Sequence, residues 1–287
     1  MKLFLLTIMN GLTLAALYFL VASGFTLVFG LMRNVNLAHG SLYLLGAYIG
    51  FDVAEATGSW LLGIAGGFVS IAILGLLLQV FIFRFMEGQE LRQTLVTIGI
   101  SIILADIMLA IWGGVTYQFE IPNGLYGVTR LPVVKVYTTY RLVILLIAIV
   151  IGLALWFFLN KTRVGMMIRA GVDDRDMLAA TGVNVHRLFA IVFMIGAGLA
   201  GFAGVVGGSA LSIAPGEDLR YLLASLVVVI VGGMGSVGGA AVGALLIGLA
   251  EQFGLAYSPT YGVVYTFIIM VLALAFRPQG LFGRSAS

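Results

Sequence analysis

The sequence contains no cysteine and very few charged residues. Of its 287 residues, 61% are hydrophobic and only 9% are charged, whereas an ordinary soluble domain has about 25% charged residues. Without cysteine, the chain has no disulfide, iron–sulfur cluster, thiolate metal site or cysteine nucleophile. A soluble globule of this length needs far more polar surface to cover its core. The composition therefore excludes a single soluble domain, a disordered chain and a nucleic-acid-binding protein, and it indicates a polytopic membrane protein.

The motifs of enzymes are also missing. A nucleotide-hydrolysing P-loop requires Gly-Lys-[Ser/Thr], and no lysine here follows a glycine. The two histidines and the serines show neither triad nor metal-ligand spacing. The string from Gly233 to Gly238 matches GxGxxG, but it lies in an apolar run and no strand separates the following helix from Glu251. We therefore expect no enzyme activity, no metal and no cofactor, and any ATP-driven function requires a separate subunit.

Long apolar runs predict the fold, because a bilayer core of about 30 Å requires about 20 apolar residues per helix. The first run is either continuous or broken near Ser23. The runs are Leu3 to Leu31, Leu37 to Phe51, Trp60 to Phe83, Leu95 to Trp112, Leu142 to Leu159, Leu188 to Leu211 and Tyr261 to Phe276. A further region, Tyr221 to Ala250, is apolar but rich in glycine, which favours two half-helices that meet inside the membrane.

These runs predict an all-α fold, a polytopic transmembrane helical bundle with about seven full spans plus a broken or re-entrant helix pair. Residues 1–287 are predicted to form a single transmembrane domain. Small residues at every fourth position predict close helix packing. One such set is Gly196, Ala200, Gly204 and Gly208, and a second is Gly235, Gly239 and Gly243.

The positions of lysine and arginine predict the orientation, because cytoplasmic loops carry an excess of both. With the N-terminus outside, ten of the fifteen basic residues lie inside. The inner residues are Arg33, Arg84, Arg92, Lys161, Arg163, Arg169, Arg175, Arg187, Arg277 and Arg284. The outer residues are Lys2, Arg130, Lys135, Arg141 and Arg220. This topology also places Glu217 and Asp218 outside, and Glu251 near the outer surface.

Polar residues within apolar runs are candidates for a translocation path. Asp106 lies about a dozen residues into its run, where a charge costs about 2.5–3.5 kcal/mol, so we expect it to face the bundle interior or a cavity. It either lines the path, couples protons in a secondary transporter, or is a hydrogen-bonded packing residue. The other candidates are Asn36, His39, Gly232, Gly233 and Gly235. Half-helix N-termini at the glycine-rich break are expected to face an anionic substrate group.

The segment from Asn160 to Arg187 holds eight of the twenty-seven charged residues and is the one sizeable segment predicted to be cytoplasmic. Asp173 and Asp174 favour the start of a helix, and Gly182 favours its end. Apolar residues at helical spacing give the predicted helix one apolar face. This face either docks into a groove of a partner protein or lies on the lipid surface.

Several motifs carry a resemblance to a known family. The segment meets the pattern RxGxxxRAxxxD followed by glycine, with Arg163, Gly165, Arg169, Ala170, Asp174 and Gly182. Further similar stretches are NLAHGSLYLLGAY at Asn36 to Tyr48, the glycine-rich region that ends at Glu251, and RPQGLFGR at Arg277 to Arg284. With these motifs, nearly the whole chain resembles the branched-chain amino acid (LIV-type) permeases of ABC importers. It departs from their general EAA motif, because Asp176-Met177-Leu178 stands in that place.

The resemblance implies a permease subunit in a bacterial inner membrane that moves branched-chain amino acids, or similar small carboxylates or amides, by alternating access. Besides the membrane lipid, it implies three kinds of protein partner: cytoplasmic ATP-binding subunits, a second homologous permease and a periplasmic solute-binding protein. It also implies that the pattern residues and Asp176 couple the permease to the ATPase. The alternatives are an ion- or proton-coupled secondary transporter that uses Asp106, and a membrane scaffold. No residue chooses among branched-chain amino acids, urea, amides and aromatic acids.

Overall fold

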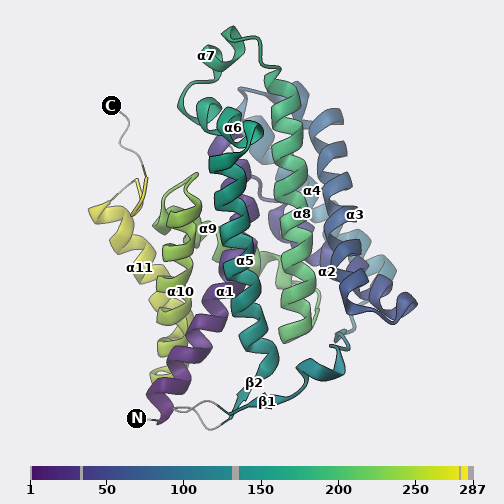
Figure 1. The fold of residues 1–287 in the computed structure, drawn as a ribbon, viewed down its shortest axis with the longest axis vertical. Helices are drawn as coiled ribbons and strands as arrows, with labels where there is room; N and C mark the ends of the chain where they lie inside the picture. The colour runs from purple at the N-terminus through teal and green to yellow at the C-terminus, as the bar shows by residue number, and fades with distance from the viewer. Residues whose placement is uncertain (1, 33–34, 131–135, 278, 284–287) are drawn as a thin grey trace.

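The computed structural model describes residues 2–32, 35–130, 136–277 and 279–283, and Figure 1 shows a bundle of helices. The α-helices are α1 (Lys2–Met32), α2 (His39–Thr57), α3 (Trp60–Phe81), α4 (Glu90–Trp112), α5 (Thr139–Lys161), α6 (Arg163–Asp173), α7 (Arg175–Ala180), α8 (Val185–Leu211), α9 (Glu217–Gly232), α10 (Val237–Tyr257) and α11 (Gly262–Phe276). The short 3-10 helices are η1 (Phe83–Met86), η2 (Asn123–Leu125) and η3 (Pro259–Tyr261). The short strands β1 (Val128–Thr129) and β2 (Tyr137–Thr138) pair in antiparallel fashion.

The long helices confirm the predicted all-α polytopic fold. Among the described residues, six helices are long and apolar enough to cross a membrane, namely α1, α3, α4, α5, α8 and α10. The first five coincide with predicted runs. The remaining two predicted runs correspond to α2, which has 19 residues, and α11, which has 15 residues. The lengths of the apolar runs thus located the helices that build the bundle.

The two ends of the bundle differ in what they carry. Figure 1 shows α6 and α7 at one end, and the N-terminus with β1 and β2 at the other. We call these the inner end and the outer end, following the predicted orientation. Arg33, Lys135 and Arg284, which contribute to the predicted charge bias, lie outside the described residues.

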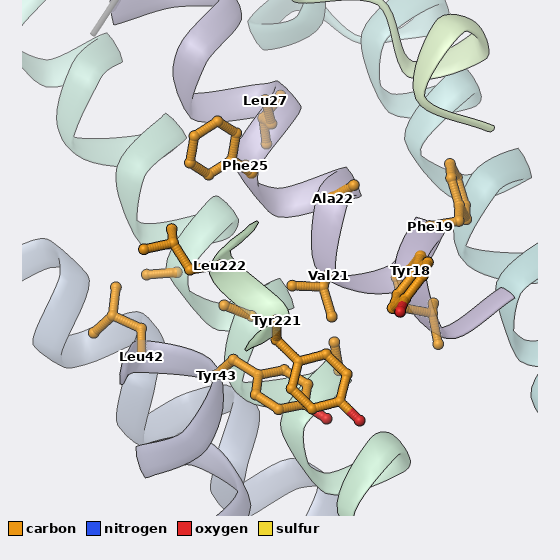
Figure 2. Packing of buried hydrophobic residues seen from close by; sticks show 14 of the residues in the cluster. Tyr18, Phe19, Val21, Ala22, Phe25, Leu27, Leu42, Tyr43, Tyr221 and Leu222 are labelled. Atoms are coloured by element: carbon orange, nitrogen blue, oxygen red, sulfur yellow. The ribbon is translucent and has the colours of Figure 1, made fainter. Parts of the chain in front are cut away.

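Helix α1 runs through the core of the bundle. Figure 2 shows Val21 and Phe25 of this helix on the side that faces Leu222 and Tyr221 of α9, and all four residues belong to the buried core. The helix is continuous over 31 residues, so a break near Ser23 is wrong. The Ser23 hydroxyl donates to the carbonyl of Leu20 at 2.7 Å, within the same helix. A helix that is apolar on every side is stable only when it is surrounded, and α1 meets this condition.

Glycines bring α8 into contact with three other helices. The backbone at Gly196 packs on Gly24 of α1, and Gly204 packs on the Tyr43 carbonyl of α2. Both contacts confirm the predicted glycine face of α8. A neighbouring residue, Gly201, has backbone atoms of α2 and α3 against it. Close backbone approach of this kind is how membrane helices gain packing contacts without a hydrophobic driving force.

Two helices begin well inside the bundle. His39 at the start of α2 contacts Val21 near the middle of α1, where its Nε2 lies 3.0 Å from the Val21 carbonyl oxygen. Gly40 in the same turn packs against Asp218 in the first turn of α9. The N-termini of α2 and α9 therefore meet near the middle of α1. The half-helix N-termini predicted at the glycine-rich break are therefore not the ones that meet inside the bundle, which belong to α2 and α9.

The glycine-rich break lies between α9 and α10 at the inner end. Gly235 packs on Gly30, close to the inner end of α1, so the prediction that this break lies inside the membrane is wrong. Helix α10 is also a full-length span of 21 residues and not a half-helix. Since Gly235 precedes α10, it is not part of a helical packing face as predicted. The glycine-rich break lies at the inner end because α9 and α10 form a hairpin whose turn reaches that end.

The C-terminal segment closes the turn of this hairpin. The backbone N–H groups of Leu281 and Phe282 each donate at 2.9 Å, to the carbonyls of Val231 and Gly232. These carbonyls belong to the last turn of α9, where an α-helix leaves its acceptors without partners. The C-terminal motif therefore satisfies the end of α9 and fixes the hairpin.

Candidate functional site

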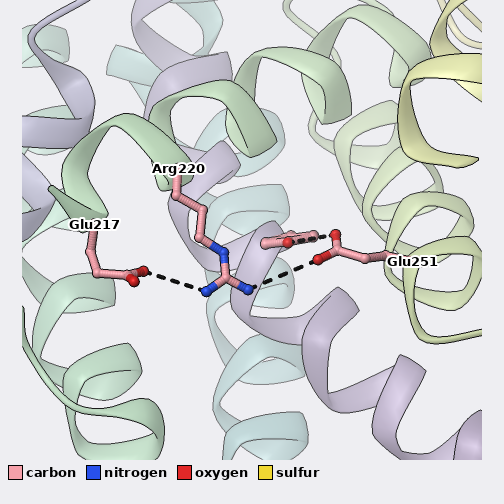
Figure 3. Close-up of polar contacts among 4 residues, drawn as sticks. Glu217, Arg220 and Glu251 are labelled. Atoms are coloured by element: carbon pink, nitrogen blue, oxygen red, sulfur yellow. Dashed lines mark hydrogen bonds and ion pairs between the residues drawn. The ribbon is translucent and has the colours of Figure 1, made fainter. Parts of the chain in front are cut away.

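Charged side chains gather at the middle of the bundle. Figure 3 shows Arg220 of α9 between Glu217, one turn earlier, and Glu251 of α10. The distance from Arg220 Nη1 to Glu217 Oε2 is 3.5 Å, and that from Arg220 Nη2 to Glu251 Oε1 is 3.9 Å. The fourth member is Tyr18 of α1, whose hydroxyl donates to Glu251 Oε2 at 2.7 Å. We call these four side chains the central ion cluster.

The depth of this cluster follows from α1. Tyr18 is the seventeenth of the 31 residues of this helix, so the cluster lies level with its middle. The predictions that Arg220 and Glu217 lie outside, and that Glu251 is solvated at the outer surface, are therefore wrong. The α9–α10 hairpin has its turn at the inner end, and its two open ends bring Arg220 and Glu251 together inside the bundle.

The members of the cluster differ in exposure. Glu251 is buried, with 7% of its side chain exposed, whereas the Arg220 side chain is 52% exposed on the surface of the chain. A guanidinium group at this depth is costly in contact with lipid, and such groups face a bundle interior or a water-filled cavity. The surface around Arg220 therefore fits an aqueous pathway.

A second polar group adjoins the cluster where α2 and α9 begin. The Ser41 hydroxyl donates to Asp218 Oδ2 at 3.1 Å and lies 2.8 Å from the hydroxyl of Ser101 on α4. The rings of Tyr43 and Tyr221 pack with centroids 4.2 Å apart, and Figure 2 shows both hydroxyl groups pointing the same way. Polar side chains from three helices, α2, α4 and α9, thus converge beside the cluster.

The predicted path residues occupy different surroundings. Asn36 and His39 are buried at the start of α2, where the side chain of Asn36 accepts a hydrogen bond from the backbone N–H of Ala38. Gly232 and Gly233 are buried in the α9–α10 turn, where their neighbours are backbone atoms. Gly235 is partly buried in the same turn. None of these five residues is part of the central ion cluster.

Asp106 does not face the bundle interior. Its side chain is exposed on the outer face of α4, while Leu104 and Met108 of the same helix are buried. The prediction that it points inward is therefore wrong for this chain. Helical geometry explains the error, because the depth of a residue in an apolar run does not specify which side of the helix it occupies.

The segment predicted to be cytoplasmic folds as two short helices, of which α7 corresponds to the predicted helix and α6 was not predicted. Asp174 caps α7, and its Oδ1 accepts hydrogen bonds from the N–H groups of Asp176 and Met177, both at 2.9 Å. Gly182 follows the helix with a φ of +85°, which favours glycine. The exposed pattern residues are Arg163, Arg169, Ala170, Asp174, Asp176 and Gly182. Gly165 is buried, because it packs on the backbone of α5.

Arg175 joins this segment to α1 and α8, and the sequence reasoning missed it. Its Nη2 donates to the carbonyl of Leu31 at 2.7 Å, and its guanidinium lies 5.2 Å from the centroid of the Phe189 ring. Gly171 of α6 also packs on the Leu31 side chain. The segment therefore contacts the inner end of the helix whose middle carries Tyr18. The sequence offered one signal for Arg175, which is its position directly after Asp174, the residue that caps α7.

A bundle of helices long and apolar enough to cross a membrane defines a multi-pass membrane protein, and a charged cluster at its middle is typical of a transport protein. The family model described as branched-chain amino acid transport system / permease component matches residues 7–274, and the chain belongs to this family. It is thus the permease component of an ABC importer and not an enzyme, because ATP hydrolysis belongs to a separate subunit. The alternative of a secondary transporter that uses Asp106 has no support.

Individual relatives agree with this assignment. The high-affinity branched-chain amino acid transport system permease protein LivH of Escherichia coli strain K12 is 32% identical, over 98% of this chain and 96% of its own length. BraD of Pseudomonas aeruginosa is 29% identical over the same shares. LivM of E. coli K12, another permease protein of this kind, is 26% identical over 94% of this chain and 68% of its own length. No solved structure shows significant similarity to the chain.

The contact between Tyr18 and Glu251 gives a prediction about stability. Tyr18→Phe removes the hydroxyl donor and leaves a buried carboxyl oxygen without its 2.7 Å partner. We expect a loss of about 1–3 kcal/mol in the free energy of unfolding, measured as a lower midpoint of thermal denaturation in detergent. Tyr257→Phe is the matched control, because Tyr257 is exposed on α10. Equal midpoints for the two variants would show that the buried contact contributes nothing.

Proposed function

We propose that this chain is one of two permease subunits of a bacterial inner-membrane importer for branched-chain amino acids. Family membership supports the class, and the names of the relatives support the substrate. The observation that carries the proposal is the exposed Arg220 at the middle of the bundle, because a charge at that depth requires an aqueous pathway. The similarity to both LivH and LivM supports pairing with a second, homologous permease.

The route proposed for the substrate passes the central ion cluster and the polar residues around Ser41. A periplasmic solute-binding protein delivers the amino acid at the outer end, and the pathway opens alternately to the two sides. Among the predicted path residues, Asn36 and His39 are buried at the start of α2, close in the chain to Ser41. Asp106 lies on a different face, and a path-lining role for it requires a partner chain against α4.

We propose that α6 and α7 receive the movement of the ATP-binding subunits. Their outward surface carries charges of both signs together with the exposed side chains of Met166 and Met177. Their inward surface contacts the inner end of α1 through Gly171 and Arg175. A displacement of this pair of helices is therefore transmitted to α1, the helix whose Tyr18 holds Glu251.

The test is transport by the assembled importer in vesicles. The chain is reconstituted with a second permease, ATP-binding subunits and a binding protein, and uptake of labelled leucine, isoleucine and valine is measured. We expect uptake to require ATP on the side of the membrane where the ATP-binding subunits lie. We also expect uptake to persist when the proton gradient is dissipated. Competition by urea, acetamide and phenylalanine tests the other substrate classes. Uptake that follows a proton gradient without ATP would contradict the proposal, and so would preference for one of these competitors.

A further inference from the structure

We propose that Arg220 binds the carboxylate of the transported amino acid, while Glu217 accepts its ammonium group. This inference rests on the proposed function and names the groups that recognise the substrate. Arg220 is the exposed member of a charged cluster that reaches the surface at the middle of the bundle. It lies one turn after Glu217 on α9, and the side chain of Glu217 is 33% exposed.

The contacts of Arg220 leave its donors available. Charge-assisted N–H···O bonds are normally about 2.7–2.9 Å long, but Arg220 lies 3.5 Å from Glu217 and 3.9 Å from Glu251. The guanidinium group therefore lies between two carboxylates without closing a bidentate pair with either. Its five N–H donors match a carboxylate in bidentate fashion. An incoming carboxylate thus offers Arg220 a better geometry than the two ion pairs it already has.

The charge around Arg220 fits a zwitterion and not a simple anion. Carboxylates of Glu217, Asp218 and Glu251 lie on or beside the cluster, against one guanidinium. This excess of acidic side chains would repel an anion that carries no cationic group. An α-amino acid places its ammonium group next to its carboxylate, so it satisfies Arg220 and Glu217 together, in place of the pair that they form with each other.

The surroundings of Arg220 also suit an aliphatic side chain. Leu219 and Leu223 are exposed on the same face of α9 and lie one turn apart. An amino acid held by Arg220 would lay its hydrocarbon group along these two leucines. The arrangement thus provides a polar and an apolar contact side by side, which is the chemistry of a branched-chain amino acid.

Substitutions at position 220 test the inference by uptake. In the assembled importer, Arg220→Gln is expected to lower Vmax/KM for leucine about tenfold to a hundredfold, the loss for a charged hydrogen-bonded contact. Arg220→Lys keeps the charge but loses the bidentate geometry, and we expect it to fall between wild type and Arg220→Gln. If Arg220 had only a structural role, lysine would restore its ion pair with Glu217 and normal uptake. Arg141→Gln is the matched control, because Arg141 lies outside the cluster and, like Arg220, contacts a neighbouring polar side chain, that of Asn10.

A binding measurement separates this inference from the proposed function. Thermal denaturation of the detergent-solubilised importer, without the binding protein, is followed with L-leucine, with L-leucinamide, which lacks the carboxylate, and with isocaproate, which lacks the ammonium group. We expect leucine alone to raise the midpoint, because a ligand stabilises the state that binds it, and we expect Arg220→Gln to abolish the rise. Equal effects of leucine and leucinamide would overturn the inference even if leucine uptake is normal. Absent leucine uptake by the wild-type importer would overturn the proposed function instead.

Discussion

Replacing Gly201 with valine is expected to reduce the amount of folded permease in the membrane several-fold. A Cβ atom at this position would meet the carbonyl oxygen of Gly67 and the side chain of Ile71, both on α3. Gly46 of α2 also lies against Gly201, so three helices would have to move apart. Overpacking costs about 1–3 kcal/mol and occasionally more. The upper part of this range applies, because backbone atoms cannot rotate away as side chains do.

Gly99→Val provides the matched control. Gly99 lies within α4, and a Cβ atom there would meet nothing within 4 Å. The same change in a helical glycine is therefore expected to leave accumulation unaltered. The measurement is the amount of monodisperse protein recovered from membranes, by fluorescence-detected size-exclusion chromatography of a tagged chain. Equal recovery of both variants would show that close packing at Gly201 is dispensable.

The spans of the bundle were predictable because hydrophobic length is nearly sufficient to specify a membrane helix. The run that starts at Trp60 begins at the first residue of α3, and the run that ends at Trp112 ends with α4. Close packing by Gly196 and Gly204 was also predictable, since small residues recur every fourth position on one face. The contacts of Gly201 with two further helices were not predictable, because they depend on which helices surround α8.

Depth was the main property that the apolar pattern did not specify. Helices α2 and α9 begin near the middle of α1, although their sequences give no sign of where a helix starts relative to the membrane. The glycine-rich break was expected inside the membrane, and it lies at the inner end beside Gly30. Glycine marks where a chain turns, but only packing against α1 sets the level of that turn.

The central ion cluster shows a related limit. Asp106 drew attention because it lies deep within one apolar run, yet it is exposed on the outer face of α4. Arg220 and Glu251 directly flank the run from Tyr221 to Ala250, so each one alone resembles an ordinary loop charge. A hairpin within that run brings its two ends together, and opposite charges at both ends were the available signal.

Loss of the α7 caps is expected to uncouple ATP hydrolysis from transport. The double variant Asp174→Ala with Gly182→Val removes the side chain that caps α7 at its N-terminus. It also places a β-branched residue at a φ of +85°, which such residues rarely adopt. Both positions are exposed at the inner end, so insertion and packing of the bundle are expected to be normal. We expect leucine uptake per ATP hydrolysed by the assembled importer to fall about tenfold, the effect of about 1.4 kcal/mol.

A second double variant, Asp174→Asn with Gly182→Asn, separates the shape of α7 from its charge. Asparagine caps a helix about as well as aspartate, and it tolerates the left-handed conformation better than other residues with side chains. This variant removes the charge of Asp174 but preserves the caps of α7. If α7 couples through its shape, uptake per ATP remains close to that of the wild type. If the carboxylate itself contacts the ATP-binding subunit, both double variants lose coupling. Normal uptake per ATP in both variants would exclude α7 from coupling, because neither its caps nor its charge would then matter.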